Sequence, residues 1–283
     1  MSRPKRIAAI HDLSAFGRCS LTAAIPILSA MGHQVLPVPT AVLSAHTGFP
    51  GFVMRETGDF VPECLMHWQG IPVEVECIYS GFLAGTEQVG EVERYLSAYP
   101  QALAVVDPVL GDDGAAYATI TPSLIAGMRR LVRRAGIITP NLTEACLLLG
   151  IPYERQVSLS RAAELTRGLC ALGPSLSILT GVEAETGLYN VGYSKEAGRA
   201  FAARCEYLPI RYPGTGDVFA SVLVGACTAG ESPEHAVALA SRFVEEALRE
   251  TMQNGGTPAE GVYFEPVLPL LRQAPPKGRI KWL

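Results

Sequence analysis

The chain has 283 residues, of which 48% are hydrophobic and 18% charged, and its formal net charge is −4. This balance excludes a disordered or fibrous protein, and the lack of Lys and Arg clusters beyond short pairs argues against a nucleic-acid binder. No uncharged apolar stretch reaches the roughly 18 residues that a membrane span needs. The seven cysteines are dispersed and odd in number, which is typical of reduced thiols in a cytoplasmic protein.

Short apolar runs alternate with longer amphipathic segments along the chain. The predicted strands are 6–10, 34–39, 74–80, 103–107, 137–139 and 175–180, and the predicted helices are 20–31, 86–98, 121–134, 141–149, 160–172, 217–229 and 233–251. Two consecutive apolar runs, 187–193 and 201–208, predict an antiparallel edge, and 41–60 predicts a loop near the site. The alternation predicts one α/β domain over residues 1–283, with a parallel sheet covered by helices on both faces.

Polar residues close most of these apolar runs. In an open α/β sheet, ligands bind outside the carboxyl ends of the strands, so these residues form the candidate site. They are His11, Asp12, Ser44 to Thr47, Asp107, Thr139, Asn141, Thr180 and the turn Gly214 to Asp217.

The most specific motif is the turn 213–217, PGTGD, which is followed by an apolar helix. Gly214 and Gly216 would allow positive φ angles and close approach by a ligand. The free N–H groups at the start of the helix, together with its dipole, predict an anion site. Asp217 beside that site suits a base that accepts a proton from an attacking hydroxyl. Taken alone, the motif is more often an ordinary turn that begins a helix, with Asp favoured in the first turn.

Two further motifs directly follow strands. The segment 139–144, TPNLTE, places Asn141 and Glu144 where they would meet a Mg²⁺-bound phosphate, or where they would simply form a capping box. The segment 107–113, DPVLGDD, brings carboxylates that suit Mg²⁺, and it is also compatible with a polar turn. Neither a P-loop nor GxGxxG occurs, so nucleotide binding would need another device.

In this order, DPVxGD, TPNxxE and a helix-opening GTGD resemble the ribokinase superfamily. The segments 10–17 and 40–48, the latter reading TAVLSAHTG, are similar to the vitamin B6 (pyridoxal) kinases within it, and the resemblance extends from about Arg6 to Leu271. It implies a ribokinase-like three-layer sandwich with a mostly parallel sheet flanked by helices. The implied activity is ATP-dependent phosphorylation of the 5′-hydroxymethyl group of pyridoxal, pyridoxine or pyridoxamine, with Mg²⁺, often K⁺, and commonly as a homodimer.

The same resemblance implies roles for individual residues. Asp217 would be the general base, and Gly214, Thr215 and Gly216 would form the anion hole. Around ATP and its metal it places Asp107, Asp112, Thr139, Asn141, Thr180 and Glu144, with Asp107 and Glu144 as metal ligands. Around the B6 ring it places Asp12, Thr47, Phe82 and Tyr117.

Two positions depart from the family's usual pattern. Asp12 stands where the family usually has a serine facing the pyridine ring, and an aspartate there favours a protonated or amine-bearing partner such as pyridoxamine, or a different heterocycle. Asp12 could equally cap the turn at 13–17. Phe82 stands where many members have tyrosine, which keeps ring stacking but removes a hydroxyl. The alternatives are a kinase for hydroxymethylpyrimidine or another small heterocycle, and a non-catalytic nucleotide- or vitamer-binding protein, against which Asp217 argues.

Overall fold

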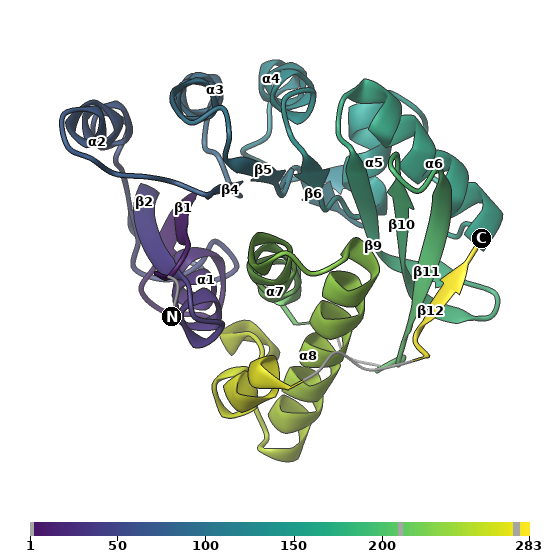
Figure 1. Cartoon of the computed structure of the whole chain (residues 1–283). Coiled ribbons are helices and arrows are strands. Elements are labelled where there is room, and N and C mark those ends of the chain that lie inside the picture. The colour runs from purple at the N-terminus through teal and green to yellow at the C-terminus, as the bar shows by residue number, and fades with distance from the viewer. Residues whose placement is uncertain (1–2, 209–211, 274–277) are drawn as a thin grey trace.

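The computed structural model describes residues 3–208, 212–273 and 278–283. Within these residues, ten strands form one sheet in the order β12-β11-β10-β9-β8-β5-β4-β1-β2-β3. Helices cover both faces of this sheet (Figure 1). The arrangement confirms the expected three-layer α/β fold.

The middle of the sheet is parallel and its margins are antiparallel. The parallel strands are β1 (Arg6–Ser14), β2 (Gln34–Leu43), β4 (Cys77–Ser80), β5 (Leu103–Val106), β8 (Ile137–Ile138) and β9 (Leu176–Ala184). The antiparallel strands are β3 (Met54–Glu56) at one margin and β10 (Gly187–Ser194), β11 (Arg199–Cys205) and β12 (Ile280–Trp282) at the other. A separate short hairpin joins β6 (Gly111–Asp112) to β7 (Ala115–Ala116). The predicted antiparallel edge is confirmed, and β12 extends it.

Alternate residues of the central strands enter two different cores. Ile7 and Ala9 of β1 pack in the core that holds α1 (Ser20–Ala30), α7 (Thr215–Ala229) and α8 (Pro233–Gln253). Ala8 and Ile10 pack in the core on the other face. The helices of that face are α2 (Phe60–Gln69), α3 (Thr86–Ala98), α4 (Pro122–Val132), α5 (Leu142–Leu149) and α6 (Leu159–Leu172). Burial on both faces explains why these strands read as continuous apolar runs.

Several helices begin where polar cap residues predict. The side chains of Thr121, Asn141 and Ser232 each accept a hydrogen bond from a backbone N–H in the first turn of α4, α5 and α8. Such caps satisfy N–H groups that have no partner inside the helix. Two 3₁₀ segments, Pro258–Glu260 and Glu265–Arg272, follow α8. Within the described ranges, no helix has both the length and the apolarity to cross a membrane.

The segment 41–60 is a correction to the sequence prediction of a loop. β2 continues to Leu43, β3 pairs antiparallel with its end, and α2 begins at Phe60. The intervening loop is closed by a hydrogen bond from the Ser44 N–H to the Val53 carbonyl, 2.9 Å long. The prediction failed because β3 lies at the sheet margin, where its side chains are largely exposed and carry no apolar pattern.

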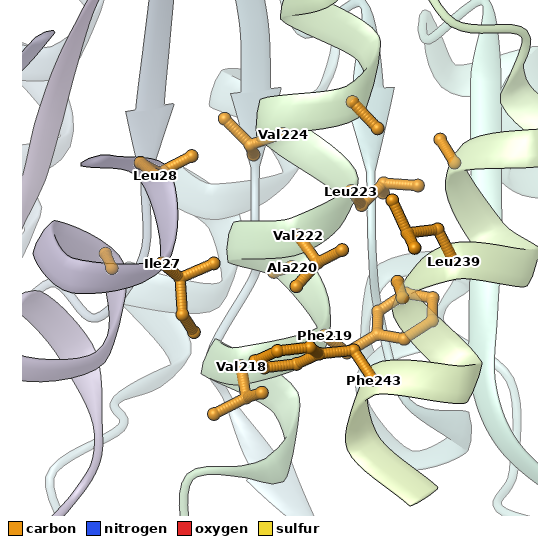
Figure 2. Packing of buried hydrophobic residues seen from close by; sticks show 14 of the residues in the cluster. Ile27, Leu28, Val218, Phe219, Ala220, Val222, Leu223, Val224, Leu239 and Phe243 are labelled. Carbon is orange, nitrogen blue, oxygen red and sulfur yellow. The ribbon is translucent and has the colours of Figure 1, made fainter. Parts of the chain in front are cut away.

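Helix α7 lies deep in the protein, and its position matters most for the site. Figure 2 shows its apolar side chains, among them Val222 and Leu223, between Ile27 of α1 and Leu239 and Phe243 of α8. A helix enclosed on both sides by close-packed side chains cannot shift without opening voids. The packing therefore fixes the N-terminus of α7 against the sheet.

Candidate active site

The strand-end polar residues gather at one edge of the sheet. Backbone hydrogen bonds cross this edge from Gly81 N–H to the Ile10 carbonyl, from Asp107 N–H to Ser80, from Thr139 N–H to Val106, and from Thr180 N–H to Pro140. The N-terminus of α7 approaches the same edge, because its N-cap Gly214 packs against the Arg18 carbonyl just beyond β1. The topology thus brings the three sequence motifs to one place.

The turn before α7 has the geometry that the predicted anion site requires, with one difference. Gly214 has φ +81°, and a Cβ there would lie 2.1 Å from the Arg18 carbonyl oxygen, so only glycine fits. Gly216 is a correction, because it lies in the first turn of α7 without a positive φ, and a Cβ there would meet nothing within 4 Å. Val218 N–H bonds back to the Gly214 carbonyl, which leaves the N–H groups of Thr215 and Gly216 without a partner inside the helix.

Asp217 follows these N–H groups and points toward β1. Its side chain is 15% exposed, and its Oδ1 lies 3.8 Å from the His11 Nε2. Burial raises the pKa of Asp217, while His11 and the Ser20 N–H oppose the shift, and the pKa stays above its ordinary value. A carboxylate with a raised pKa is a stronger proton acceptor, which suits a general base.

Asp107 is buried at the end of β5 and is held by Thr139. The Thr139 hydroxyl donates to the Asp107 Oδ1 at 2.9 Å. Burial, followed by the like charge of Asp217, raises the pKa of Asp107 to about 7. Thr180 lies half-buried on the neighbouring β9, where its backbone pairs with that of Asn141. Asp107 and Thr139 are therefore in contact, and Thr180 lies beside Asn141, as the strand-end argument predicts.

The capping box at the start of α5 is present, and it does more than cap the helix. The Glu144 Oε2 accepts from Asn141 N–H at 2.8 Å, and its Oε1 accepts from Leu110 N–H at 3.1 Å. The Asn141 Nδ2 donates to the Gly111 carbonyl at 2.8 Å. Burial, and then Asp107, raise the pKa of Glu144 well above its ordinary value. The box therefore ties the acidic loop after β5 to α5.

The donor set is compatible with a magnesium ion that arrives with phosphate. Burial raises the pKa values of Asp107 and Glu144, so a nearby cation would relieve two unfavourable charges. The described residues contain no cluster of three or more His, Cys, Asp or Glu that could hold a metal alone. Mg²⁺ usually takes one or two carboxylates plus waters and phosphate oxygens. Both Glu144 oxygens already accept backbone N–H bonds, so Asp107 is the better direct ligand.

Three of the four residues predicted around the substrate ring lie on three different loops or strand ends, and the fourth, Asp12, lies in β1. Thr47 is exposed in the loop after β2, and Phe82 is half-buried after β4. Tyr117 follows β7 with 45% of its surface exposed, and burial together with the Glu144 and Asp112 carboxylates raises its pKa. The exposed Asp112 lies in β6.

Asp12 is buried beside His11. The Ser14 hydroxyl, at the end of β1, donates to the Asp12 Oδ2 at 3.0 Å. The other oxygen faces His11 at 4.0 Å. Burial tends to raise the pKa of Asp12, but His11, together with the Ser20 and Ser14 side chains, outweighs burial, and the pKa falls below its ordinary value.

The family follows from a match over most of the chain. Residues 7–260 match the phosphomethylpyrimidine kinase family model. The chain belongs to this family. A pyridoxal kinase PdxY of Deinococcus radiodurans is 32% identical over 251 residues, which cover 83% of each chain. This relative supports the resemblance to the pyridoxal kinases of the ribokinase superfamily.

Solved structures agree with the family assignment. One is a Bacteroides thetaiotaomicron protein that is described as a phosphomethylpyrimidine kinase and was crystallised with pyridoxal. It is 37% identical to this chain with a TM-score of 0.95, and the match covers 99% of this chain and 100% of that one. The pyridoxal kinase of Lactobacillus plantarum is 30% identical with a TM-score of 0.88, over 95% and 97% of the two chains.

Two residues of this kinase site had no role in the sequence prediction. The sequence marks His11 only as a strand-end polar residue, whereas its ring faces both Asp12 and Asp217. Ser20 begins α1 with φ +48°, an uncommon conformation for a residue with a side chain. Its backbone N–H lowers the pKa of Asp217. An imidazole directly after four buried apolar residues was the available signal for His11, and the sequence carried none for Ser20.

Proposed function

We propose that this chain is a kinase that transfers the terminal phosphoryl group of ATP to the 5′-hydroxymethyl group of pyridoxal, pyridoxine or pyridoxamine. The observation that carries the proposal is Asp217, a largely buried carboxylate placed directly beside the free N–H groups of a fixed helix N-terminus. The B6 substrate class is supported by the chain's similarity to pyridoxal kinases and by the pyridoxal found in crystals of the Bacteroides thetaiotaomicron protein.

In the proposed reaction, Asp217 accepts the proton of the substrate hydroxyl while that oxygen forms its bond to the terminal phosphorus of ATP. The bond from this phosphorus to the bridging oxygen breaks, and ADP leaves with the electron pair. The N–H groups of Gly214, Thr215 and Gly216 hold the phosphoryl oxygens during the transfer, since a helix N-terminus in a dry site stabilises developing negative charge.

The acidic loop and α5 would hold the nucleotide. Asp107 would bind Mg²⁺ directly, and Glu144 would fix the loop that carries Asp107. Mg²⁺ bound with the nucleotide supplies neutralisation of the phosphate charge. The nucleotide would also be contacted by Asp112, Thr139, Asn141 and Thr180. A requirement for K⁺ and a homodimeric assembly stay predictions from the resemblance.

Asp12, Thr47, Phe82 and Tyr117 would surround the substrate ring. The lowered pKa of Asp12 keeps this carboxyl ionised at neutral pH, which favours a substrate with a positive charge near it. Phe82 offers a ring face without a hydroxyl. This combination favours pyridoxamine or a ring protonated at nitrogen over a neutral ring.

A second candidate is a kinase for hydroxymethylpyrimidine, a pyrimidine related to the one named in the description of the matching family model, phosphomethylpyrimidine kinase. The same base and anion hole would serve it, and only the residues around the ring would differ. A binding protein without turnover is disfavoured, because a binder would need the N–H groups of α7 but not the base.

The test is substrate-dependent release of ADP by the purified protein with Mg-ATP and K⁺. Pyridoxal, pyridoxine, pyridoxamine and hydroxymethylpyrimidine are compared, with Asp217→Asn as the matched control for contaminating kinases. Release with any B6 vitamer, lost in the control, supports the proposal. Release of ADP with hydroxymethylpyrimidine alone supports the second candidate instead. No release with any of these substrates, despite ATP binding, contradicts both candidate activities.

A further inference from the structure

His11 is a fully buried histidine at the centre of the site. It lies in β1, where the register with β2 shifts between His11 and Leu13. Such irregularities reorient side chains and often occur beside active sites. The His11 Nε2 lies 3.8 Å from the Asp217 Oδ1, and the Nδ1 lies 4.0 Å from the Asp12 Oδ1. The ring therefore lies between the proposed base and the proposed ring-side carboxylate.

The two ring nitrogens have matching surroundings. Each is buried, faces a carboxylate, and has no hydrogen-bond partner among the described side chains and backbone. An ionised carboxylate only accepts hydrogen bonds, so each nitrogen needs a hydrogen to interact favourably with it. A neutral ring would turn a lone pair toward one of the two carboxylates. The arrangement therefore fits the doubly protonated imidazolium.

Two other residues confine the ring, and a third adds charge. Tyr79 of β4 contacts it edge-on, with ring centroids 5.0 Å apart. Gly81 lies beneath it, because a Cβ there would fall 1.7 Å from the Nε2. Asp107, after β5, adds a weaker attraction for a positive charge on the ring. Glycine at position 81 is thus what allows an imidazole to occupy this place.

Granting the proposed function, we infer that His11 is a positioning residue for phosphoryl transfer, an imidazolium that links Asp12 on the substrate side to the Asp217 base. The link fixes the direction of the Asp217 carboxylate, which α7 alone holds only at its backbone. It also keeps Asp217 ionised and ready to accept a proton, although Asp107 and Asp12 add like charges nearby.

The balance of charges agrees with this assignment. Burial lowers the pKa of His11, but Asp12, Asp217 and Asp107 together outweigh burial, and the pKa rises above its ordinary value. In return, His11 lowers the pKa values of both carboxyls. Removing the imidazolium therefore should make Asp217 protonate at higher pH.

The first experiment needs no substitution at the site and no activity. The protein is labelled with ¹⁵N-histidine, and the ring nitrogens of His11 are assigned by elimination with glutamine variants of the other four histidines. At about pH 7.5, one unit above the ordinary histidine pKa of ~6.5, His11 should give the imidazolium pattern with both nitrogens protonated. A neutral His11 ring at that pH overturns the inference.

The second experiment follows kcat against pH at saturating Mg-ATP and the best substrate. In His11→Gln, the acidic limb should move up by about one to three pH units, the usual effect of an opposite charge at this range. Gly81→Ala, which displaces the ring without removing a titratable group, should move it in the same direction. His33→Gln is the matched control, because His33 is a buried histidine whose Nε2 meets only the Gly225 carbonyl, at 2.9 Å.

An unchanged acidic limb in both site variants would make His11 a structural residue and overturn the inference. If neither variant folds, the ¹⁵N pattern of the parent protein decides alone. If the parent phosphorylates none of the substrates, the proposed function fails, while the ¹⁵N pattern still tests the charge state of His11 independently.

Discussion

Replacing Asp217 by asparagine tests the centre of the mechanism. Asparagine has nearly the same size and keeps the packing around a side chain that is 15% exposed. What it loses is the ability to accept a proton. A positioned general base contributes about 10²- to 10⁴-fold in rate, so kcat should fall by that factor, equivalent to ~3–5 kcal/mol in the activation barrier.

The same substitution should not weaken the fold. Burial raises the pKa of Asp217, and Asp217 is itself a like charge that raises the pKa of Asp107 to about 7. Asp217→Asn removes this repulsion. The melting temperature at about pH 8, above the pKa of Asp107, should therefore equal or exceed that of the parent. A loss of activity without a loss of stability would identify a chemical role rather than a structural one.

Three measurements on Asp217→Asn decide the point: ADP release, ATP binding by calorimetry, and thermal unfolding. The control is Asp59→Asn, since Asp59 is an exposed aspartate that precedes α2 and forms no side-chain cap. Turnover within threefold of the parent would remove Asp217 from the mechanism. A matching loss of ATP affinity would show instead that the carboxylate serves nucleotide binding.

Four further outcomes are expected. Asp107 has a folded pKa of about 7 against an ordinary 3.8, so the folded state holds a proton that the unfolded chain releases, and stability falls as pH rises between these values. Asp107→Asn should therefore stabilise the metal-free protein above pH ~7 in thermal unfolding and lose this advantage near pH ~4; a constant difference would contradict the shift. Gly214→Ala should destabilise by at least ~1–2 kcal/mol because of its positive φ, whereas Gly216→Ala should keep or gain up to ~1 kcal/mol while lowering activity; equal denaturation midpoints would refute the contrast. Asp12→Ser should change the ratio of kcat/KM among the three B6 vitamers with little change in ATP affinity, and an equal loss on all three would mark it as structural. Chelation by EDTA should abolish ADP release and added Mg²⁺ should restore it, so undiminished turnover in metal-free buffer would refute the metal requirement.

The sequence predicted those elements that are buried on both faces. β1, β4 and β5 are continuous apolar runs because the sheet is covered on each side, and such runs are visible without a structure. The missed elements lack this signal. β3 and β12 lie at the sheet margins with largely exposed side chains, and α2 buries only part of one face.

The candidate site was predictable in its parts but not in its contacts. The order of the motifs placed Asp107, Asn141 and Asp217 at strand ends and a helix start, and the sheet brings them together. The neighbours of His11 were not predictable, because they depend on where β1 lies in the sheet and on how α7 approaches it. Similarly, only the structure shows that Glu144 uses both oxygens on backbone N–H groups and so favours Asp107 as the metal ligand.

The negative charge of the site determines which ligands can bind without a metal ion. The sheet edge that is proposed to bind a polyphosphate carries four carboxyl groups, those of Asp12, Asp107, Glu144 and Asp217. A positive charge on His11 offsets only part of their negative charge. Buried like charges attract cations and repel a free nucleotide. The N–H groups of α7 carry only a partial positive charge, about half an elementary charge for a whole helix. ATP should therefore bind tightly only together with Mg²⁺, whereas a B6 vitamer that carries a positive charge should bind beside Asp12 without metal.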